Sequence, residues 1–70
     1  MKALHSPMAG TVWKVVVKPG DTLAAGDVAV LLESMKMEIP VEVESSGTVE
    51  EVLVAEGQVV DEGVVVLTYR

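Results

Sequence analysis

Short stretches of alternating apolar and polar residues run along this chain, and glycine-containing turns separate them. In one such stretch Trp13, Val15 and Val17 alternate with Lys14 and Lys18. A period of two residues is typical of a β-strand with one buried face. We therefore expect this strand to turn its tryptophan and valines inward, with the Trp13 ring filling the core or its rim. Because the equivalent residue in the second half of the chain is Glu50, the alternative for Trp13 is a half-exposed ring on a contact surface.

Four tetrapeptides mark the turns, and each has glycine in third place: "KPGD", "AAGD", "AEGQ" and "DEGV". In the first, Pro19 fixes φ near −65° and Gly20 supplies a positive φ, which predicts a type II turn. The valine-rich segments between these turns are short, as strands are. The pattern predicts an all-β protein.

The two halves of the chain are copies of one unit. The segment that begins at Gly10 overlays the segment that begins at Gly47 without a gap, and glycines at the turns coincide with glycines. Two copies are too few for a solenoid, so we expect the halves to close on each other with approximate two-fold symmetry. Val12 and Val49 share the same wrong parity for the buried face. A bend or β-bulge after each repeat's first glycine would bring both inward.

The segment "LLESMKMEIP" (31–40) joins the two halves and predicts a β-hairpin. One register places all its apolar residues on the inner side, and a one-residue slip would turn one strand's apolar set outward. The predicted cross-strand pairs are Leu32 with Ile39, Val30 with Val41, and Val28 with Val43. By the internal repeat, Leu4 and Leu67 pair in the same way near the chain ends.

This register leaves Met35 and Lys36 as a two-residue loop. Such loops adopt type I′ or II′ turns, which need positive φ and favour Asn and Gly. Neither residue suits that backbone, and Glu33 opposite Glu38 adds a mildly repulsive pair. The repeat also places the tip at the pole opposite the chain ends. These residues indicate a function rather than a folding role.

Composition narrows the classes of function. Seventy residues make one domain, 1–70, and the absence of cysteine excludes disulfides and thiolate metal sites. A formal net charge of −6 argues against nucleic acid and anionic membranes as partners. No apolar run has the length of a membrane span, so we expect a soluble, cytoplasmic protein. His5 stands alone, which predicts no metal site.

Lys36 is the residue most suited to chemistry. A catalytic lysine needs burial or a neighbouring cation, and a tip beside Glu33 and Glu38 offers neither. An exposed lysine is instead a good acceptor when another enzyme supplies the base. On a stiff hairpin its flexible stem becomes the base of a swinging arm.

The motif "ESMKMEIP", with "SPMAG", "KPGD" and "EGQVVDEG", resembles the biotinyl domain of biotin carboxyl carrier proteins over nearly the whole chain. The resemblance implies a flattened β-barrel of two four-stranded antiparallel sheets, a barrel-sandwich hybrid with quasi-two-fold symmetry. It implies biotin attached covalently to Lys36 by a biotin protein ligase. Met35 and Met37 would flank the lysine as recognition residues, with Glu33, Ser34 and Glu38 as further hairpin flanks.

The same resemblance implies a non-catalytic carrier. Its biotin would be carboxylated at a biotin carboxylase site and would deliver the carboxyl group at a carboxyltransferase site of a biotin-dependent carboxylase, such as an acyl-CoA carboxylase. Ser34 stands where many biotinyl domains have alanine. The thumb insertion of some bacterial carriers and their Ala/Pro-rich linker have no counterpart, so the chain resembles the short thumbless carriers or a domain of a longer carboxylase.

Two alternatives remain. A lipoyl carrier of a 2-oxo-acid dehydrogenase or glycine cleavage system, or a dual biotin/lipoyl attachment protein, would hold a dithiolane on Lys36. Lipoyl domains, however, usually have an acidic residue before the lysine and rarely a methionine after it. An interaction module would leave Lys36 unmodified and dock a partner on Met35 and Met37. The identity of the carboxyl acceptor stays open.

Overall fold

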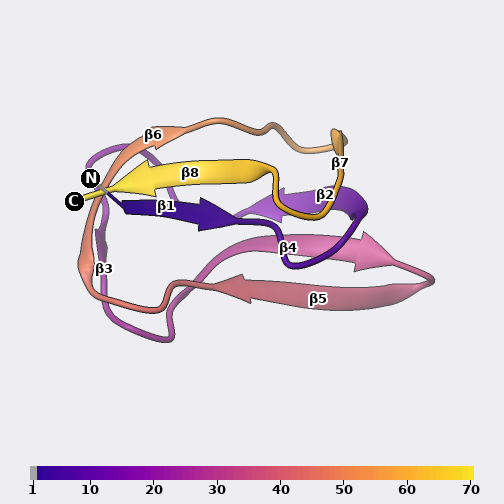
Figure 1. Ribbon diagram of the computed structural model, residues 1–70, viewed down its shortest axis with the longest axis horizontal. Helices are drawn as coiled ribbons and strands as arrows, with labels where there is room; N and C mark the ends of the chain where they lie inside the picture. The colour runs from indigo at the N-terminus through magenta and orange to yellow at the C-terminus, as the bar shows by residue number, and fades with distance from the viewer. Residues whose placement is uncertain (1) are drawn as a thin grey trace.

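The computed structural model describes residues 2–70, which form eight β-strands and no helix (Figure 1). The strands make two four-stranded sheets with the orders β1-β8-β6-β3 and β5-β4-β2-β7, and all neighbours are antiparallel. This confirms the predicted fold. The strands are β1 Lys2–His5, β2 Gly10–Val15, β3 Thr22–Leu23, β4 Val28–Ser34, β5 Met37–Glu42, β6 Gly47–Val52, β7 Val59–Val60 and β8 Val65–Tyr69.

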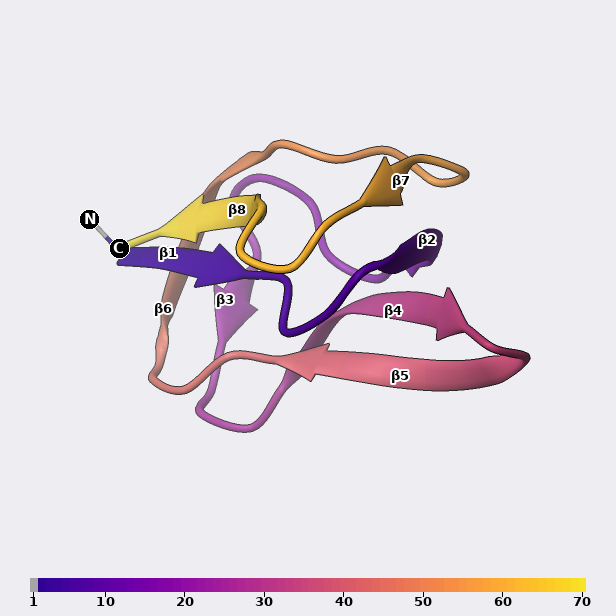
Figure 2. The same cartoon turned by 45° about the vertical axis from the view of Figure 1, so that its right-hand side comes forward.

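The internal repeat is a structural repeat. Gly20 donates its N–H to the Val49 carbonyl at 2.9 Å, and the matching residues of the other half do the same, with Gly57 donating to the Val12 carbonyl at 2.7 Å. In sheet order, each strand of one half also has its counterpart in the other. Figure 2 shows the two halves wrapped around one another. The predicted two-fold relation between the halves is confirmed.

The glycine turns also match the prediction. Gly20, Gly26, Gly57 and Gly63 all have positive φ, between 89° and 94°. In the first turn the Asp21 N–H donates to the Lys18 carbonyl at 3.1 Å, and its carboxylate accepts from the Lys18 N–H at 3.0 Å. Both ends of this type II turn are thereby tied together.

A β-bulge follows the first glycine of each repeat, as the parity of the valines predicts. The register shifts between Val12 and Lys14 in β2, and between Val49 and Glu51 in β6. Val12 and Val49 are buried as a result. The expectation that the Trp13 ring fills the core or its rim is wrong, and the alternative of a half-exposed ring is confirmed: the bulge puts both Trp13 and Lys14 on the solvent side, and Trp13 is 51 % exposed.

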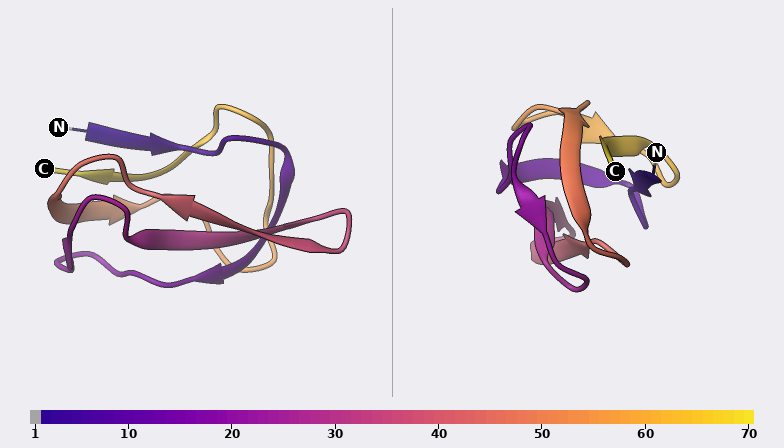
Figure 3. Two further views of the ribbon diagram at one scale, coloured as in Figure 1. Left: turned by 90° about the horizontal axis from the view of Figure 1, so that it is seen from below. Right: turned by 90° about the vertical axis from the view of Figure 1, so that its left-hand side faces the viewer.

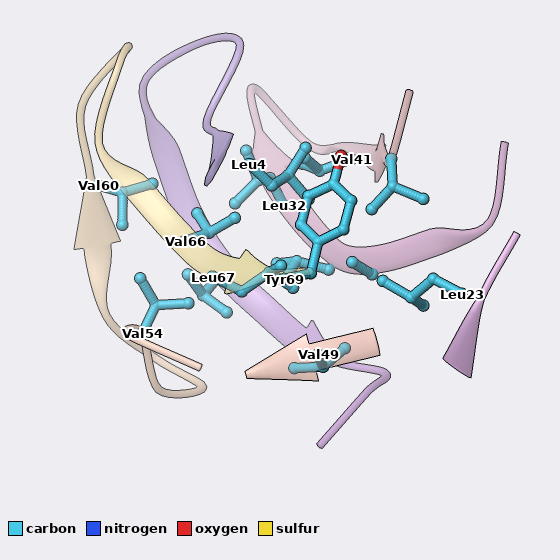
Figure 4. Close-up of a cluster of buried hydrophobic side chains, with 14 residues drawn as sticks. Leu4, Leu23, Leu32, Val41, Val49, Val54, Val60, Val66, Leu67 and Tyr69 are labelled. Carbon is cyan, nitrogen blue, oxygen red and sulfur yellow. The ribbon is translucent and has the colours of Figure 1, made fainter. Parts of the chain in front are cut away.

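The core lies between the two sheets and consists almost entirely of aliphatic side chains (Figure 4). Burying a leucine or valine contributes about 1.5–3 kcal/mol, so aliphatic residues alone give a small barrel an adequate core. Its members are Leu4, Val12, Leu23, Ala29, Val30, Leu32, Val41, Val43, Val49, Val54, Val60, Val66, Leu67 and Tyr69.

The register of the β4–β5 hairpin agrees with the prediction over most of its length. Leu32 pairs with Ile39 and Val30 with Val41, while Leu4 pairs with Leu67 at the other end of the molecule. The prediction that Val28 pairs with Val43 is wrong. An irregularity at Ala29 shifts Val28 onto Glu42, and Val43 instead bonds through its backbone to Gly26 and Asp27.

The irregularity at Ala29 brings Ala29 into the core and leaves Val28 outside it. Ala29 is fully buried as the extra residue, and Val43 is still buried, with 2 % of its surface exposed. The sequence pattern placed Val43 inward correctly, whereas Val28 is only partly buried, pairs with the exposed Glu42 and does not belong to the core. The pattern did not reveal that Ala29 is an extra residue in the strand, because alanine occurs on both buried and exposed faces.

Candidate functional site: the hairpin tip

The tip of the β4–β5 hairpin is formed by Met35 and Lys36. Their φ angles are 52° and 66°, and they are the only non-glycine residues with positive φ in residues 2–70. Positive φ at both central positions defines a type I′ turn, whose twist matches that of the flanking strands. The predicted two-residue loop is therefore present, as the first of the two expected turn types.

Backbone pairing between neighbouring strands supports the hairpin as far as its tip. Ser34 pairs with Met37, and Glu33 pairs with Glu38 on one side and with Thr11 of β2 on the other. A Cβ atom on Gly10 would approach the Glu33 carbonyl oxygen to 2.9 Å, so glycine lets β2 pack closely against the hairpin at this level. The tip is consequently a short projection from a well-supported base.

Lys36 and its neighbours face solvent. Met35 is 91 % exposed and Met37 is 62 % exposed, while Glu33 and Glu38 are exposed and Ser34 is partly buried. The single ion pair found in residues 2–70 joins Arg70 to Glu50, far along the chain from the tip. The Lys36 ammonium is therefore available for another molecule, and the structure brings together all six predicted site residues.

The tip and the chain ends lie at opposite poles. The molecule measures 31 × 19 × 18 Å, and Figure 3 shows the β4–β5 turn at one end of the long axis with both chain ends at the other. This is the arrangement that the repeat predicts, because the position equivalent to Lys36 falls beyond either end of the chain.

An open groove of about 480 Å³ lies between edge strands β1 and β5, and its walls include His5, Pro40 and Glu42 but no residue of the tip. Residues 2–70 contain no cluster of His, Cys, Asp or Glu that could hold a metal ion. None of their segments forms a helix capable of crossing a membrane.

For Trp13 the structure agrees with the second of the two placements that the sequence allows, the half-exposed ring. It lies on the β5-β4-β2-β7 sheet that carries the tip, in the bulge opposite Leu31. The equivalent residue in the other half is Glu50, which suits solvent, and this difference is the signal in the sequence for a half-exposed ring.

Comparison with known proteins places this geometry in a family. Residues 2–68 match the family model described as "Biotin-requiring enzyme". The chain therefore belongs to this family of biotinyl and lipoyl domains. Several related sequences have biotin in their names.

Two short relatives cover most of the chain. A biotin/lipoyl attachment protein of Bacillus subtilis is 53 % identical over 60 residues, which span 86 % of this chain and 82 % of that protein. A biotinylated protein TB7.3 homolog of Mycobacterium leprae is 47 % identical over 60 residues, spanning 86 % of this chain and 84 % of that protein.

Other relatives are much longer. The chain spans 10 % of the biotin-dependent acyl-coenzyme A carboxylase alpha3 subunit of M. leprae, at 43 % identity over 63 residues and 90 % of this chain. A single-chain, multi-domain long-chain acyl-CoA carboxylase of known structure matches with a TM-score of 0.90 and 37 % identity, over 97 % of this chain and 7 % of that one.

A lipoyl domain of the 2-oxoglutarate dehydrogenase complex from Azotobacter vinelandii shares the fold. Its TM-score is 0.75 at 24 % identity, covering 97 % of this chain and 96 % of that domain. The fold is thus common to biotinyl and lipoyl domains, and the biotin-carrier assignment depends on the sequence relatives.

Proposed function

We propose that this chain is a single carrier domain of a biotin-dependent carboxylase and that Lys36 is its attachment residue. The observation that carries the proposal is the exposed amine on a type I′ turn between two exposed methionines, at the pole opposite the chain ends. Relatives named as biotin/lipoyl attachment and biotin carboxyl carrier proteins support biotin as the attached group.

The residues of the tip suit this role. In the attachment reaction the Lys36 nitrogen forms an amide bond with an activated biotin carboxyl group, the activating group leaves, and the amine loses a proton to a base of the modifying enzyme. The Met35–Lys36 turn holds the amine outward, and Met35 and Met37 offer apolar contacts on either side of it. We propose that the modifying enzyme is a biotin protein ligase and that it reads these flanks.

When bound, biotin supplies a ring nitrogen that accepts and releases a carboxyl group. The protein itself supplies a rigid base and a tethered arm, which raises the local concentration of the carried group at each partner. It contributes no catalytic residue. Relatives within carboxylase chains support biotin carboxylase and carboxyltransferase domains as its partners. We propose that it works with them in the cytoplasm.

Intact-mass spectrometry tests the attachment. The purified chain, incubated with biotin protein ligase, biotin and ATP, should gain one biotin-sized increment, and the Lys36→Arg variant should gain none. Arginine keeps the charge and length at the tip, so loss of the increment reports on the amine itself.

Incubation with a lipoate ligase distinguishes the alternative carrier. A lipoyl-sized increment on Lys36, in place of the biotin-sized one, would show a lipoyl domain. A folded chain that accepts neither group would contradict both carrier functions and favour the unmodified interaction module.

A further inference from the structure

The outer face of the sheet that carries Lys36 has exposed apolar residues next to the tip. Thr11 of β2 pairs with Glu33 of β4 and with Val59 of β7, so these side chains form one row across the sheet. Two residues further along β2, the bulge places Trp13 beside Leu31, which pairs with Pro40. We call this surface the tip face and define it by its four apolar residues, Trp13, Leu31, Pro40 and Val59.

These residues are accessible. Val59 is 73 % exposed and Trp13 is 51 % exposed, Pro40 is exposed and Leu31 is partly buried. No element of residues 2–70 packs over this side of the sheet, because the core lies on the other side. Residues one or two positions apart on adjacent strands are within about 8 Å of each other, so the four side chains form one patch.

The internal repeat provides a control for this patch. The equivalent face of the β1-β8-β6-β3 sheet has the same strands, the same bulge and the same pairing. There the positions of the tip face hold polar or small residues. Trp13, Val59, Leu31 and Pro40 correspond to Glu50, Thr22, Thr68 and Ala3.

The comparison separates folding from function. Because one copy of the unit folds with Glu, Thr, Thr and Ala at these positions, the fold does not require apolar residues there. Exposed apolar side chains gathered on one face mark an interaction site rather than a folding need. The patch is present only on the sheet whose hairpin carries Lys36.

Charges next to the patch add a second asymmetry. Glu33 and Glu38 are directly paired between the tip face and the tip, and like charges in that position repel. At the position equivalent to Glu33 the other sheet has Arg70, which forms an ion pair with Glu50. The carboxylates at the tip have no such cation among residues 2–70. A partner with cationic side chains would relieve their repulsion.

Distance relates the patch to the lysine. Leu31, opposite the bulge, precedes Met35 by four residues, which is about 13 Å along a strand. A standard protein interface of about 800 Å² per partner is roughly 30 Å across and would cover both the tip and the patch. Any enzyme that takes the unmodified lysine into its active site has to contact the tip and is therefore placed beside the patch.

We propose that the tip face is a docking surface for the biotin protein ligase. The inference rests on the proposed function. The Trp13 ring would enter an apolar depression of the ligase, flanked by Leu31 and Val59, while basic side chains of the ligase face Glu33 and Glu38. A carboxylase domain approaches a lysine already lengthened by biotin and has less need of this surface.

Steady-state biotinylation of the full chain tests the proposal. With biotin protein ligase, biotin and ATP, Trp13→Glu should lower kcat/KM at least tenfold, mainly through KM, and Trp13→Phe should recover most of that loss. The matched control is Leu53→Glu, which also places a carboxylate on a half-exposed apolar residue, 45 % exposed, in the other half of the molecule. Its kcat/KM should stay within twofold of wild type.

Circular dichroism shows which variants are folded. If Trp13→Glu does not fold, Val59→Glu provides a second test within the tip face. Trp13 is the sole tryptophan of the chain, so its indole N–H gives one NMR resonance. That resonance should shift when unlabelled ligase is added without ATP. Folded Trp13→Glu and Val59→Glu variants that are biotinylated at the wild-type rate would overturn the docking surface.

Two other results would also overturn it. A concentration-dependent dimer that Trp13→Glu dissociates, with unchanged biotinylation, would show that the face binds a second copy. Normal biotinylation with impaired carboxylation of the attached biotin would assign the face to a carboxylase domain. Failure of the proposed function looks different, because the wild-type chain would then take up no biotin at all.

Discussion

Backbone strain in this protein is concentrated at the residues that we assign to function. The four glycine turns have glycine wherever φ is positive, whereas the hairpin tip has Met35 and Lys36 at positive φ, 52° and 66°. A non-glycine residue in the left-handed region costs about 1 kcal/mol or more. The turn sequence is therefore suboptimal for stability and is explained by the need for a lysine between methionines.

Replacing the tip by a preferred turn sequence tests that explanation. The double variant Met35→Asn, Lys36→Gly should raise the free energy of unfolding by about 1 kcal/mol, because Asn-Gly suits a type I′ turn. Urea unfolding followed by circular dichroism measures the change, and the variant should accept no biotin. Equal or lower stability would show that the tip carries no strain.

The converse substitution, from glycine to a non-glycine residue at positive φ, is the control for the double variant. At Gly20, with φ of 94° and nothing within 4 Å of an added Cβ atom, alanine meets no steric obstacle. Gly20→Ala should therefore lower stability by about 1 kcal/mol through backbone strain alone.

The turns show how each repeat is built from local interactions. In three of the four, the last side chain accepts a hydrogen bond from the first N–H of the turn: Asp21 from Lys18, Asp27 from Ala24 and Gln58 from Ala55. In the fourth, Val64 takes this place and packs against the core instead. The hydrogen bond is thus a stabilising addition to a turn that glycine and the strand pairing define.

Removing one of these side chains gives a prediction for the turn. Asp27→Ala deletes the 2.8 Å bond from the Ala24 N–H and should lower the free energy of unfolding by about 1 kcal/mol. Glu62→Ala is the matched control, an exposed acidic residue in the fourth turn, and should change stability by less than about 0.5 kcal/mol. Equal effects of the two variants in urea unfolding would contradict a specific role for the Asp27 carboxylate.

At the scale of the whole molecule, the two-fold relation separates the attachment site from the chain ends. The hairpin tip of the first half is matched in the second half by the chain termini, so the long axis of 31 Å lies between them. Relatives that are short proteins and relatives that are small parts of long carboxylases share this unit. The arrangement suits both, because a neighbouring domain joined at the chain ends does not cover the tip.

A fusion tests this separation. A folded protein attached after Arg70 should leave kcat/KM for biotinylation within about twofold of the unfused chain, whether the linker is short or long. Mass spectrometry of timed samples measures the rate. A loss of tenfold or more with the short linker, recovered with the long one, would mean that the chain end lies close enough to obstruct the ligase.

Sequence reasoning alone predicts the strands, the glycine turns, the two-fold repeat, the bulges and the register at the hairpin tip. These features follow from periodicity and turn chemistry, which act over a few residues. The exposure of Trp13, the pairing of Val28 with Glu42 and the patch beside the tip were decided by the tertiary structure. Each depends on which strands become neighbours and on where an extra residue in a strand changes the face of the sheet to which the side chains point. A linear pattern records the order of side chains, whereas the surface they share is set only when the sheet has formed.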